Sequence, residues 1–314
     1  MKKLFISMLA VAALASCSND EVLSYDKEAI EFGNVFVDNS TRAAAAADPS
    51  YNATNLTAFN VYGAVEGVNI FAGAKISKGE AAYGVAWTPA TGTTTQYWIA
   101  GAKYIFDAVV DATSVTTDTA TGLPTTLSYN TDTQKDMLHK RVTTVGKPTD
   151  NNGLVAFSFT HLLSKVKFTV TNTTASTATG YRYTISDIAI TGANLTGDYA
   201  VVDGAWSNVT TGSYTIDDIT VASAATEECA AEVLLIPGTN KVGMSFKVNI
   251  EMNNGSEWKT ITTTPKTYTD VIALAANTAY NFTVSVGLDD QIKFTAQPVA
   301  SWTPTAGPIE TPLQ

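Results

Sequence analysis

The sequence predicts an all-β protein of two β-sandwich domains. Short runs rich in threonine and valine are separated by Gly, Asn, Asp and Pro, which is the pattern of strands joined by turns. Long helical patterns are absent, and only 15% of the residues are charged. A chain of 314 residues is also long for a single core, so more than one domain is expected.

Residues 1–17 are typical of a lipoprotein signal peptide. Lys2 and Lys3 precede an apolar run at residues 4–14 that is too short to span a bilayer, and Cys17 completes a Leu-Ala-Ser-Cys lipobox. We expect cleavage before Cys17 and attachment of lipid to its sulfur, which would hold the precursor in the outer membrane. The alternative is an ordinary secretory signal with an incidental cysteine.

Residues 18–42 contain one strand-like run. Its apolar residues are Ile30, Phe32, Val35 and Val37. Arg42 follows, and Ala43 begins a run of alanines. A small-residue stretch after a basic residue is a typical site of proteolysis, so one interpretation is cleavage between Arg42 and Ala43. The other is a surface arginine before an alanine-rich linker.

Residues 43–150 are predicted to form the first domain. Candidate strands lie at residues 56–64, 84–87, 97–98 and 102–110, with glycines between them. Five aromatic residues in these strands allow two interpretations, a sugar-stacking surface or ordinary core packing: Trp87, Tyr97, Trp98, Tyr104 and Phe106. Core packing is the more common role of such residues.

Residues 151–288 are predicted to form the second domain, after a boundary rich in turn-forming residues at 146–153. Phe157 and Phe159 have odd numbers, whereas Val166, Phe168 and Val170 have even numbers, so we expect a bulge or a tight crossing at residues 161–165. Later strands are expected at residues 181–190, 233–236, 244–252 and 280–286, and a short helix at residues 222–231.

Residues 289–314 form a C-terminal appendage in this interpretation. Its apolar residues are Ile292, Phe294, Val299 and Trp302. Pro298, Pro304, Pro308 and Pro312 make a central strand impossible here, because proline cannot donate to a strand ladder. The segment is therefore either a tail or an edge strand that folds back on its own domain.

Three stretches, in this order along the chain, resemble the fimbrillins, the type V pilin family of Bacteroidales. They are FSFTHLLSKVKFTVTN at residues 157–172, LIPG at residues 235–238, and LAANTAYNFTVSVGLDDQIKFTAQPVASW at residues 274–302. The resemblance implies sandwich domains of the transthyretin-like or Greek-key type. It also implies a removable first strand at residues 18–42, cut after Arg42 by an Arg-specific protease.

In the same family the end of the chain is similar to a strand that fills the groove of the next subunit. The resemblance assigns this contact to Ile292, Phe294, Val299 and Trp302. It therefore predicts a structural subunit of a surface fimbria that assembles with other fimbrial subunits by donor-strand exchange. The alternative is a surface lipoprotein adhesin or glycan-binding module that does not polymerise and that binds a host protein or glycan.

Other classes of function have little support in the sequence. The formal net charge of −10 comes without a basic stripe, which argues against a nucleic-acid partner. His139 and His161 lie apart, and known catalytic or metal-binding spacings do not occur, so we expect no enzyme activity, no cofactor and no metal. With Cys17 lipidated, Cys229 remains as a single thiol, and an intramolecular disulfide cannot form.

Overall fold

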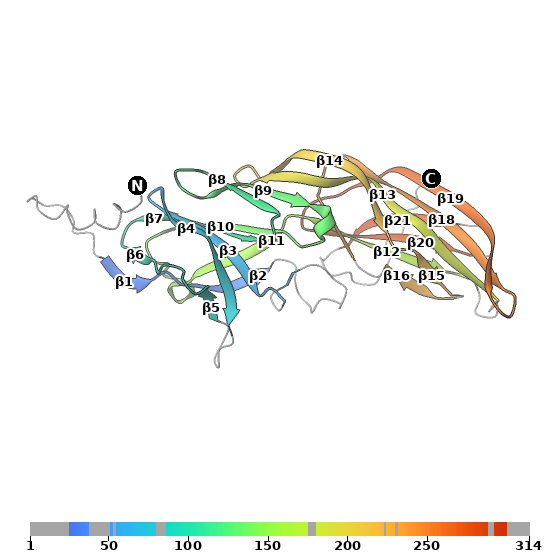
Figure 1. Cartoon of the computed structure of the whole chain (residues 1–314), viewed down its shortest axis with the longest axis horizontal. Coiled ribbons are helices and arrows are strands. Elements are labelled where there is room, and N and C mark those ends of the chain that lie inside the picture. Colours follow the sequence, from blue (N-terminus) through green and yellow to red (C-terminus); the bar gives the residue numbers. More distant parts are fainter. Residues whose placement is uncertain are drawn as a thin grey trace, which may run out of the picture.

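The computed structural model describes residues 25–37, 51–52, 55–79, 86–174, 180–222, 224–229, 232–287 and 292–299. They form an elongated molecule of two lobes (Figure 1). The helical content of this part of the chain is two 3₁₀ turns, η1 (Thr131–Thr133) and η2 (Asn151–Gly153). The predicted all-β class is confirmed.

The N-terminal lobe is a sheet of seven strands that closes into a barrel in the order β10, β11, β2, β5, β4, β3, β7. Their bounds are β2 (Phe32–Val37), β3 (Ala58–Val65), β4 (Val68–Gly79), β5 (Ala86–Pro89), β7 (Lys103–Val110), β10 (Leu138–Val145) and β11 (Val155–His161). All neighbours are antiparallel except β2 and β11, which run parallel. A separate ribbon pairs β1 (Tyr25–Ala29) with β6 (Tyr97–Ile99).

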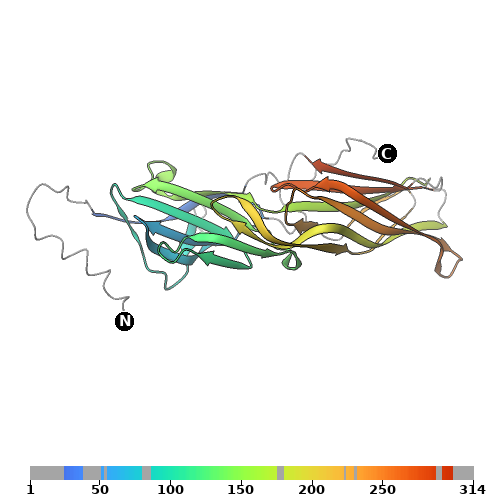
Figure 2. The ribbon, with the colours of Figure 1, turned by 90° about the horizontal axis from the view of Figure 1, so that it is seen from above.

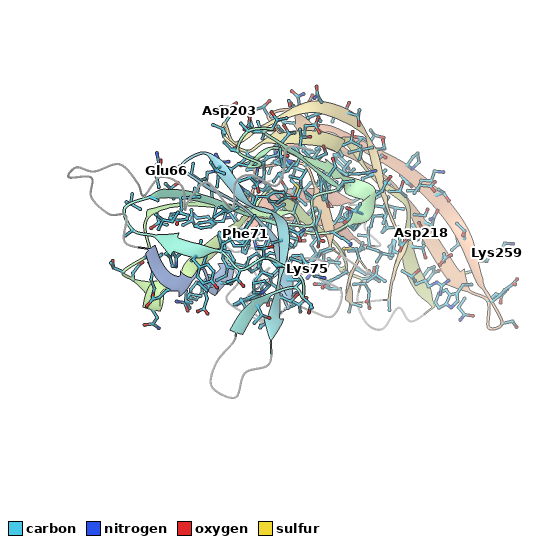
Figure 3. The ribbon with its side chains drawn as sticks, turned by 60° about the vertical axis from the view of Figure 1, so that its left-hand side comes forward. Glu66, Phe71, Lys75, Asp203, Asp218 and Lys259 are labelled. Atoms are coloured by element: carbon cyan, nitrogen blue, oxygen red, sulfur yellow. The ribbon has the colours of Figure 1, made fainter. Side chains whose placement is uncertain are left out.

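Aromatic side chains fill the barrel. Figure 3 labels one of them, Phe71, and also shows how the side chains are spread over both lobes. The buried rings come from six of the barrel strands and from β6: Phe32, Phe59, Phe71, Trp87, Trp98, Tyr104, Phe106, Phe157 and Phe159. Such rings bury a large area each, so they supply most of the apolar contact in this core.

The C-terminal lobe is a sandwich of two sheets (Figure 2). One sheet contains β12 (Ser164–Asn172), β16 (Thr226–Glu228), β17 (Val233–Leu235), β20 (Thr278–Val286) and β21 (Lys293–Val299). The other contains β8 (Ser114–Thr117), β9 (Pro124–Asn130), β13 (Tyr181–Ala200), β14 (Ala205–Ile216), β15 (Ile219–Val221), β18 (Lys241–Asn253) and β19 (Trp258–Ala273). The predicted short helix at residues 222–231 is wrong, because β16 pairs there with Thr169–Thr171 of β12.

The core between these sheets follows the predicted alternation. Val166, Phe168 and Val170 of β12 are fully buried, as are Phe282 and Val284 of the parallel neighbour β20. The opposite face of β12 is also largely buried, whereas the sequence predicted a strand with one exposed face. Lys165 is only 1% exposed there, and its Nζ lies 2.8 Å from Oε2 of Glu232. A buried ammonium group needs such a partner, since desolvation would otherwise disfavour its charge.

The predicted tight crossing is present between His161 and Ser164. β11 ends at His161 in the barrel and β12 begins at Ser164 in the sandwich, so this passage between the lobes consists of Leu162 and Leu163. The change of sheet explains why the buried residues change from odd to even numbers.

Strand pairing does not follow the predicted boundary at residues 150 and 151. β11 follows that boundary but pairs with β10 and β2 of the barrel. β8 and β9 precede it but belong to the sheet of β13. β13 reaches 20 residues, long enough for its last part to lie over the barrel and pair with β9. The turn at 146–153 joins two strands of one lobe, since turn-forming residues mark hairpins as well as boundaries.

A third core lies where the lobes meet. Its buried members come from both lobes and from the crossing: Val109, Leu127, Tyr129, Met137, Leu162, Leu163, Val201, Leu234 and Ile236. Two polar contacts to buried aspartates accompany it. His161 Nδ1 donates to Asp136 at 2.7 Å, and Arg141 forms two hydrogen bonds to Asp107 Oδ2 and one to its Oδ1. The lobes are therefore packed as one body.

No helix in the described part of the chain has the length and hydrophobicity that a membrane crossing requires.

Leu163→Ala should reveal the coupling between the lobes. Leu163 is fully buried in the junction core, so its truncation should lower the free energy of unfolding by about 2–5 kcal/mol. Urea unfolding followed by tryptophan fluorescence and circular dichroism should show one transition shifted as a whole. Val202→Ala, at a side chain 74% exposed, is the control and should change stability by about 0.5 kcal/mol or less. Separate transitions for the two lobes would contradict the coupling.

Candidate functional site

β2, which we call the first strand because it comes first among the barrel strands, forms part of the barrel wall. It pairs in parallel with β11 from Phe32–Val155 to Val37–Phe159, and it meets β5 at Phe32–Trp87. The backbone just before it is also bonded. Ile30 N donates to Gln96 O at 2.8 Å, and Val155 N donates to Glu31 O at 2.9 Å. Because β2 comes before the other barrel strands in the sequence, the chain between β2 and β3 is its covalent link to the rest of the barrel.

The predicted apolar residues of this strand point into the barrel. Ile30, Phe32 and Val37 are buried, and Val35 is partly buried against the same core. The ring of Phe32 packs against three other rings, with centroid distances of 5.6 Å to Phe71 and 6.0 Å to Phe106 and Phe157. These rings belong to three different strands, so Phe32 lies at the centre of the aromatic core.

A kink at Asn34 divides the strand. Asn34 has a φ of 49°, and the pairing with β11 shifts register between Ala156 and Ser158. A left-handed residue of this kind marks a bulge, which turns the following side chains. Phe36 is consequently 59% exposed on the outer surface. At Gly33, an added Cβ would lie 2.5 Å from Cδ1 of Leu154, so a larger residue here would require the Leu154 side chain to shift.

One loop, residues 146–154, holds the first strand from outside; we call it the clasp loop. Lys147 forms an ion pair with Glu28, and Asn34 Nδ2 donates to Oδ1 of Asn151 at 3.2 Å. Leu154 lies against Gly33. The same loop thus contacts β1 at Glu28 and β2 just before and at its kink. The sequence predicted only a turn at these residues. Its pattern gave no indication that the loop contacts β2.

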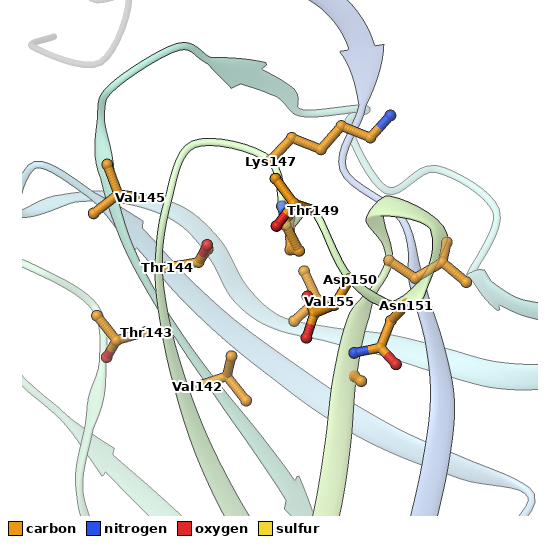
Figure 4. Close-up of a pocket in the computed structure, with 12 residues that line it drawn as sticks. Val142, Thr143, Thr144, Val145, Lys147, Thr149, Asp150, Asn151 and Val155 are labelled. Atoms are coloured by element: carbon orange, nitrogen blue, oxygen red, sulfur yellow. The ribbon is translucent and has the colours of Figure 1, made fainter.

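A cavity of about 440 Å³ lies between β10 and β11, beneath the clasp loop (Figure 4). These strands pair at Leu138–His161 and His139–Thr160, and beyond these two positions they diverge. Val142 and Thr144 line one side and Val155 the other. We call this space the β10–β11 slot. It lies on one edge of β11, whereas β2 occupies the other edge.

Two of the predicted tail residues, Phe294 and Val299, lie in an edge strand of the sandwich. β21 pairs antiparallel with β20 from Lys293–Ser285 to Val299–Ala279, and the described chain places no strand on its other side. Phe294 is buried and its ring lies 4.8 Å from that of Tyr268, whose phenol pKa is raised by burial. Ile292 packs partly buried against the same core. These residues therefore fold back on their own lobe in this structure.

Other predicted site residues lie outside the described residues: Cys17, Arg42, Ala43 and Trp302. The aromatic residues considered for sugar stacking are mostly in the barrel core, since Trp87, Trp98, Tyr104 and Phe106 are buried and only Tyr97 is exposed. Within the described part of the chain, no group of three His, Cys, Asp or Glu residues is arranged to hold a metal ion.

Comparison with protein families matches residues 41–302 to the family described as Fimbrillin-like. The chain belongs to this family. Among curated proteins, no sequence matches this fimbrillin-like chain. Membership supports a role as a fimbrial subunit or in adhesion, and a location at the cell surface.

Solved structures with the same fold include a candidate cell adhesion protein from Bacteroides uniformis, with a TM-score of 0.54, 18% identity, and coverage of 88% of this chain and 97% of that one. A fimbrial protein from Bacteroides vulgatus has a TM-score of 0.54 at 12% identity, covering 88% and 99% of the two chains. A candidate cell adhesion protein from Bacteroides ovatus has a TM-score of 0.54 at 17% identity, covering 90% and 100%. At these identities the likeness establishes the fold of the fimbrillin-like chain.

Phe32→Ala tests how strongly the first strand is held. Removing a ring that contacts three others should lower the free energy of unfolding by about 3–5 kcal/mol. Phe36→Ala, in the same strand, is the matched control and should change it by about 0.5 kcal/mol or less, because Phe36 is mostly exposed. Thermal unfolding of the uncleaved protein measures both. Equal effects of the two substitutions would mean that the strand does not pack as described.

Proposed function

We propose that this chain is a structural subunit of a surface fimbria. It is made as a precursor lipidated at Cys17 in the outer membrane, is cut between Arg42 and Ala43 by an Arg-specific protease, and assembles with other fimbrial subunits by donor-strand exchange. The observation that carries this proposal is the place of β2, which fills the barrel core but lies before the proposed cut. The region shared with the family begins at residue 41, after this strand.

Loss of β2 would leave the barrel incomplete. Ile30, Phe32 and Val37 are buried, and each such side chain contributes about 1.5–3 kcal/mol, so roughly 5–9 kcal/mol of apolar burial would be lost. That is comparable to the whole stability of a typical domain, about 5–15 kcal/mol. The edges of β11 and β5 would also lose their partner. A strand from another subunit restores both the burial and the backbone hydrogen bonds.

The donor in this proposal is the C-terminal segment that carries Ile292, Phe294, Val299 and Trp302. β21 is an edge strand held by β20 alone among the described strands, so it can leave without opening the middle of a sheet. Its departure takes Phe294 out of its own core, and insertion into a neighbouring barrel offsets that loss. The donor side chains would then take the places of Ile30, Phe32, Val35 and Val37.

A second candidate function is a surface adhesin or glycan-binding lipoprotein that keeps its first strand. The observation that favours it is the completeness of the uncut barrel, which needs no strand from a partner. Its ligand would be a host protein or glycan, and its chain would not polymerise.

Cleavage with an Arg-specific protease separates the two candidates. The sequence contains three arginines, and Arg141 and Arg182 lie in β10 and β13 with ion pairs to Asp107 and Glu251. Arg42 should therefore be cut first, releasing residues 18–42 and giving ladders on a gel that survive mild detergent. Arg42→Gln is the control and should stay monomeric. Complete cleavage at Arg42 that leaves only monomers would favour the adhesin.

Deletion of residues 291–314 tests the donor. The shortened chain should keep a folded barrel but, after cleavage, should form no ladder of its own. Mixed with the cleaved full chain, it should still accept a strand and so appear in the ladder at the end of each polymer. Gel electrophoresis and circular dichroism measure assembly and folding. Polymerisation of the shortened chain by itself would show that the donor lies elsewhere.

A further inference from the structure

We propose that the β10–β11 slot is a docking site for an extended peptide, and that its occupant is the segment of residues 300–314 of a second copy of this chain. This inference rests on the proposed function, because it places the first contact between two subunits while β2 is still in place. The slot and the position of β2 are the two edges of one strand, β11.

On both walls of the slot, backbone N–H and C=O groups are available to pair with a further strand. Gly146 N bonds to Ala102 on the β7 side, and Met137 O accepts from Leu162 on the β11 side. Because residues of a strand alternate between its two edges, Arg141, Thr143 and Val145 turn their N–H and C=O groups toward the slot. The pairing of β10 with β11 ends at His139, so these groups have no strand partner in the described structure.

β11, which forms the facing wall of the slot, also has backbone groups without a strand partner in the described structure. Val155 N donates to Glu31 O, toward β2, so the odd-numbered residues of β11 face β2. Ala156 and Ser158 therefore turn their N–H and C=O groups into the slot, where register pairs with β10 are missing from the described structure. Two bare strand edges that face each other across a cavity match an extended polypeptide, which bonds to both, better than a compact ligand.

The lining decides which peptide fits. Near β10 and β11 it is small and uncharged, with Val142, Thr144, Val155 and Ala156. Its charged members, Lys147 and Asp150, belong to the clasp loop. The free edge from Arg141 to Val145 is five residues long, or about 17 Å at the rise of a strand. The occupant is therefore a short extended segment of small or β-branched residues with little charge.

Residues 300–314 have this chemistry. Apart from Trp302 and Leu313, they are prolines and small, β-branched or polar residues, and Glu310 is their only charged residue. Pro304, Pro308 and Pro312 oppose helix formation. All three have even numbers, so in an extended segment the missing N–H groups lie along one edge, and the odd-numbered residues can pair fully with one wall of the slot.

Residues 300–314 can reach the slot of a second copy more readily than the slot of their own chain. Val299 pairs with Ala279, next to Thr278, which is the partner of Ser164 at the lobe junction. The segment after Val299 thus starts at the junction, where the pair Leu138–His161 closes the base of its own slot. The other end of the slot lies beneath the clasp loop, at the end of the barrel away from the junction (Figure 1).

The test uses the uncleaved full chain and a fluorescent peptide of residues 300–314. Fluorescence anisotropy should show saturable binding, and a peptide of the same residues in scrambled order should bind at least about tenfold more weakly. Hydrogen exchange should show new protection at residues 141, 143, 145, 156 and 158 when the peptide is bound, because pairing removes these amides from water. Protection elsewhere, or none, overturns the proposal.

Thr143→Pro removes one free N–H from the slot and leaves the even-numbered residues of β10 bonded to β7. It should weaken peptide binding about tenfold or more. Ser114→Pro is the matched control, because it changes the first residue of the edge strand β8, far from the slot, and should leave binding unchanged. Equal binding by both variants, with circular dichroism confirming that each is folded, overturns the proposal.

Three further outcomes distinguish the docking proposal from the proposed function. If the amides of residues 141, 143 and 145 are already protected in the free full chain and become exposed when residues 300–314 are deleted, the occupant is the chain's own segment and not that of a second copy. If the peptide fails to bind but the cleaved chain forms ladders, the slot is not a docking site while strand exchange stands. Peptide binding without ladders after cleavage supports the slot and contradicts the proposed function.

Discussion

The packing of Phe32 among Phe71, Phe106 and Phe157 is the interaction on which the N-terminal lobe depends. It joins the first strand to rings from three other strands, and close-packed interiors tolerate the loss of such a side chain poorly. β2 has little else to hold it toward β5, where a single register pair forms. The strand is therefore bound mainly by side chains on one face and by β11 on one edge. That arrangement is compatible with both a stable precursor and an exchangeable strand.

The sequence predicted elements well where alternation carries the signal. The apolar residues of the first strand, the crossing after His161 and the core face of β12 all follow from the spacing of buried side chains. Partners far apart in the chain have no such signal. Nothing in the sequence indicates that β2 pairs with β11, that β9 joins β13, or that Lys165 is buried beside Glu232. Periodicity reports which face of a strand is buried, but not which strand lies beside it.

The candidate site was predictable in part for the same reason. Ile30, Phe32 and Phe294 are recognisable as strand residues, and their apolar side chains do lie in cores. The clasp loop reads as an ordinary turn, because its contacts with Glu28, Gly33 and Asn34 depend on the three-dimensional path of a distant strand. The slot is still less visible. It arises because two strands that are consecutive in sequence pair at two positions and then separate.

The junction between the lobes has a mechanical consequence. The chain changes sheet between the barrel and the sandwich three times, and five register pairs join β9 to the end of β13 where that strand overlies the barrel. A pulling force along the long axis would load these hydrogen bonds together in shear, in parallel with the covalent passages and the junction core. Strands loaded in this way resist extension collectively and do not unzip bond by bond. Each molecule would then respond to tension as one stiff body.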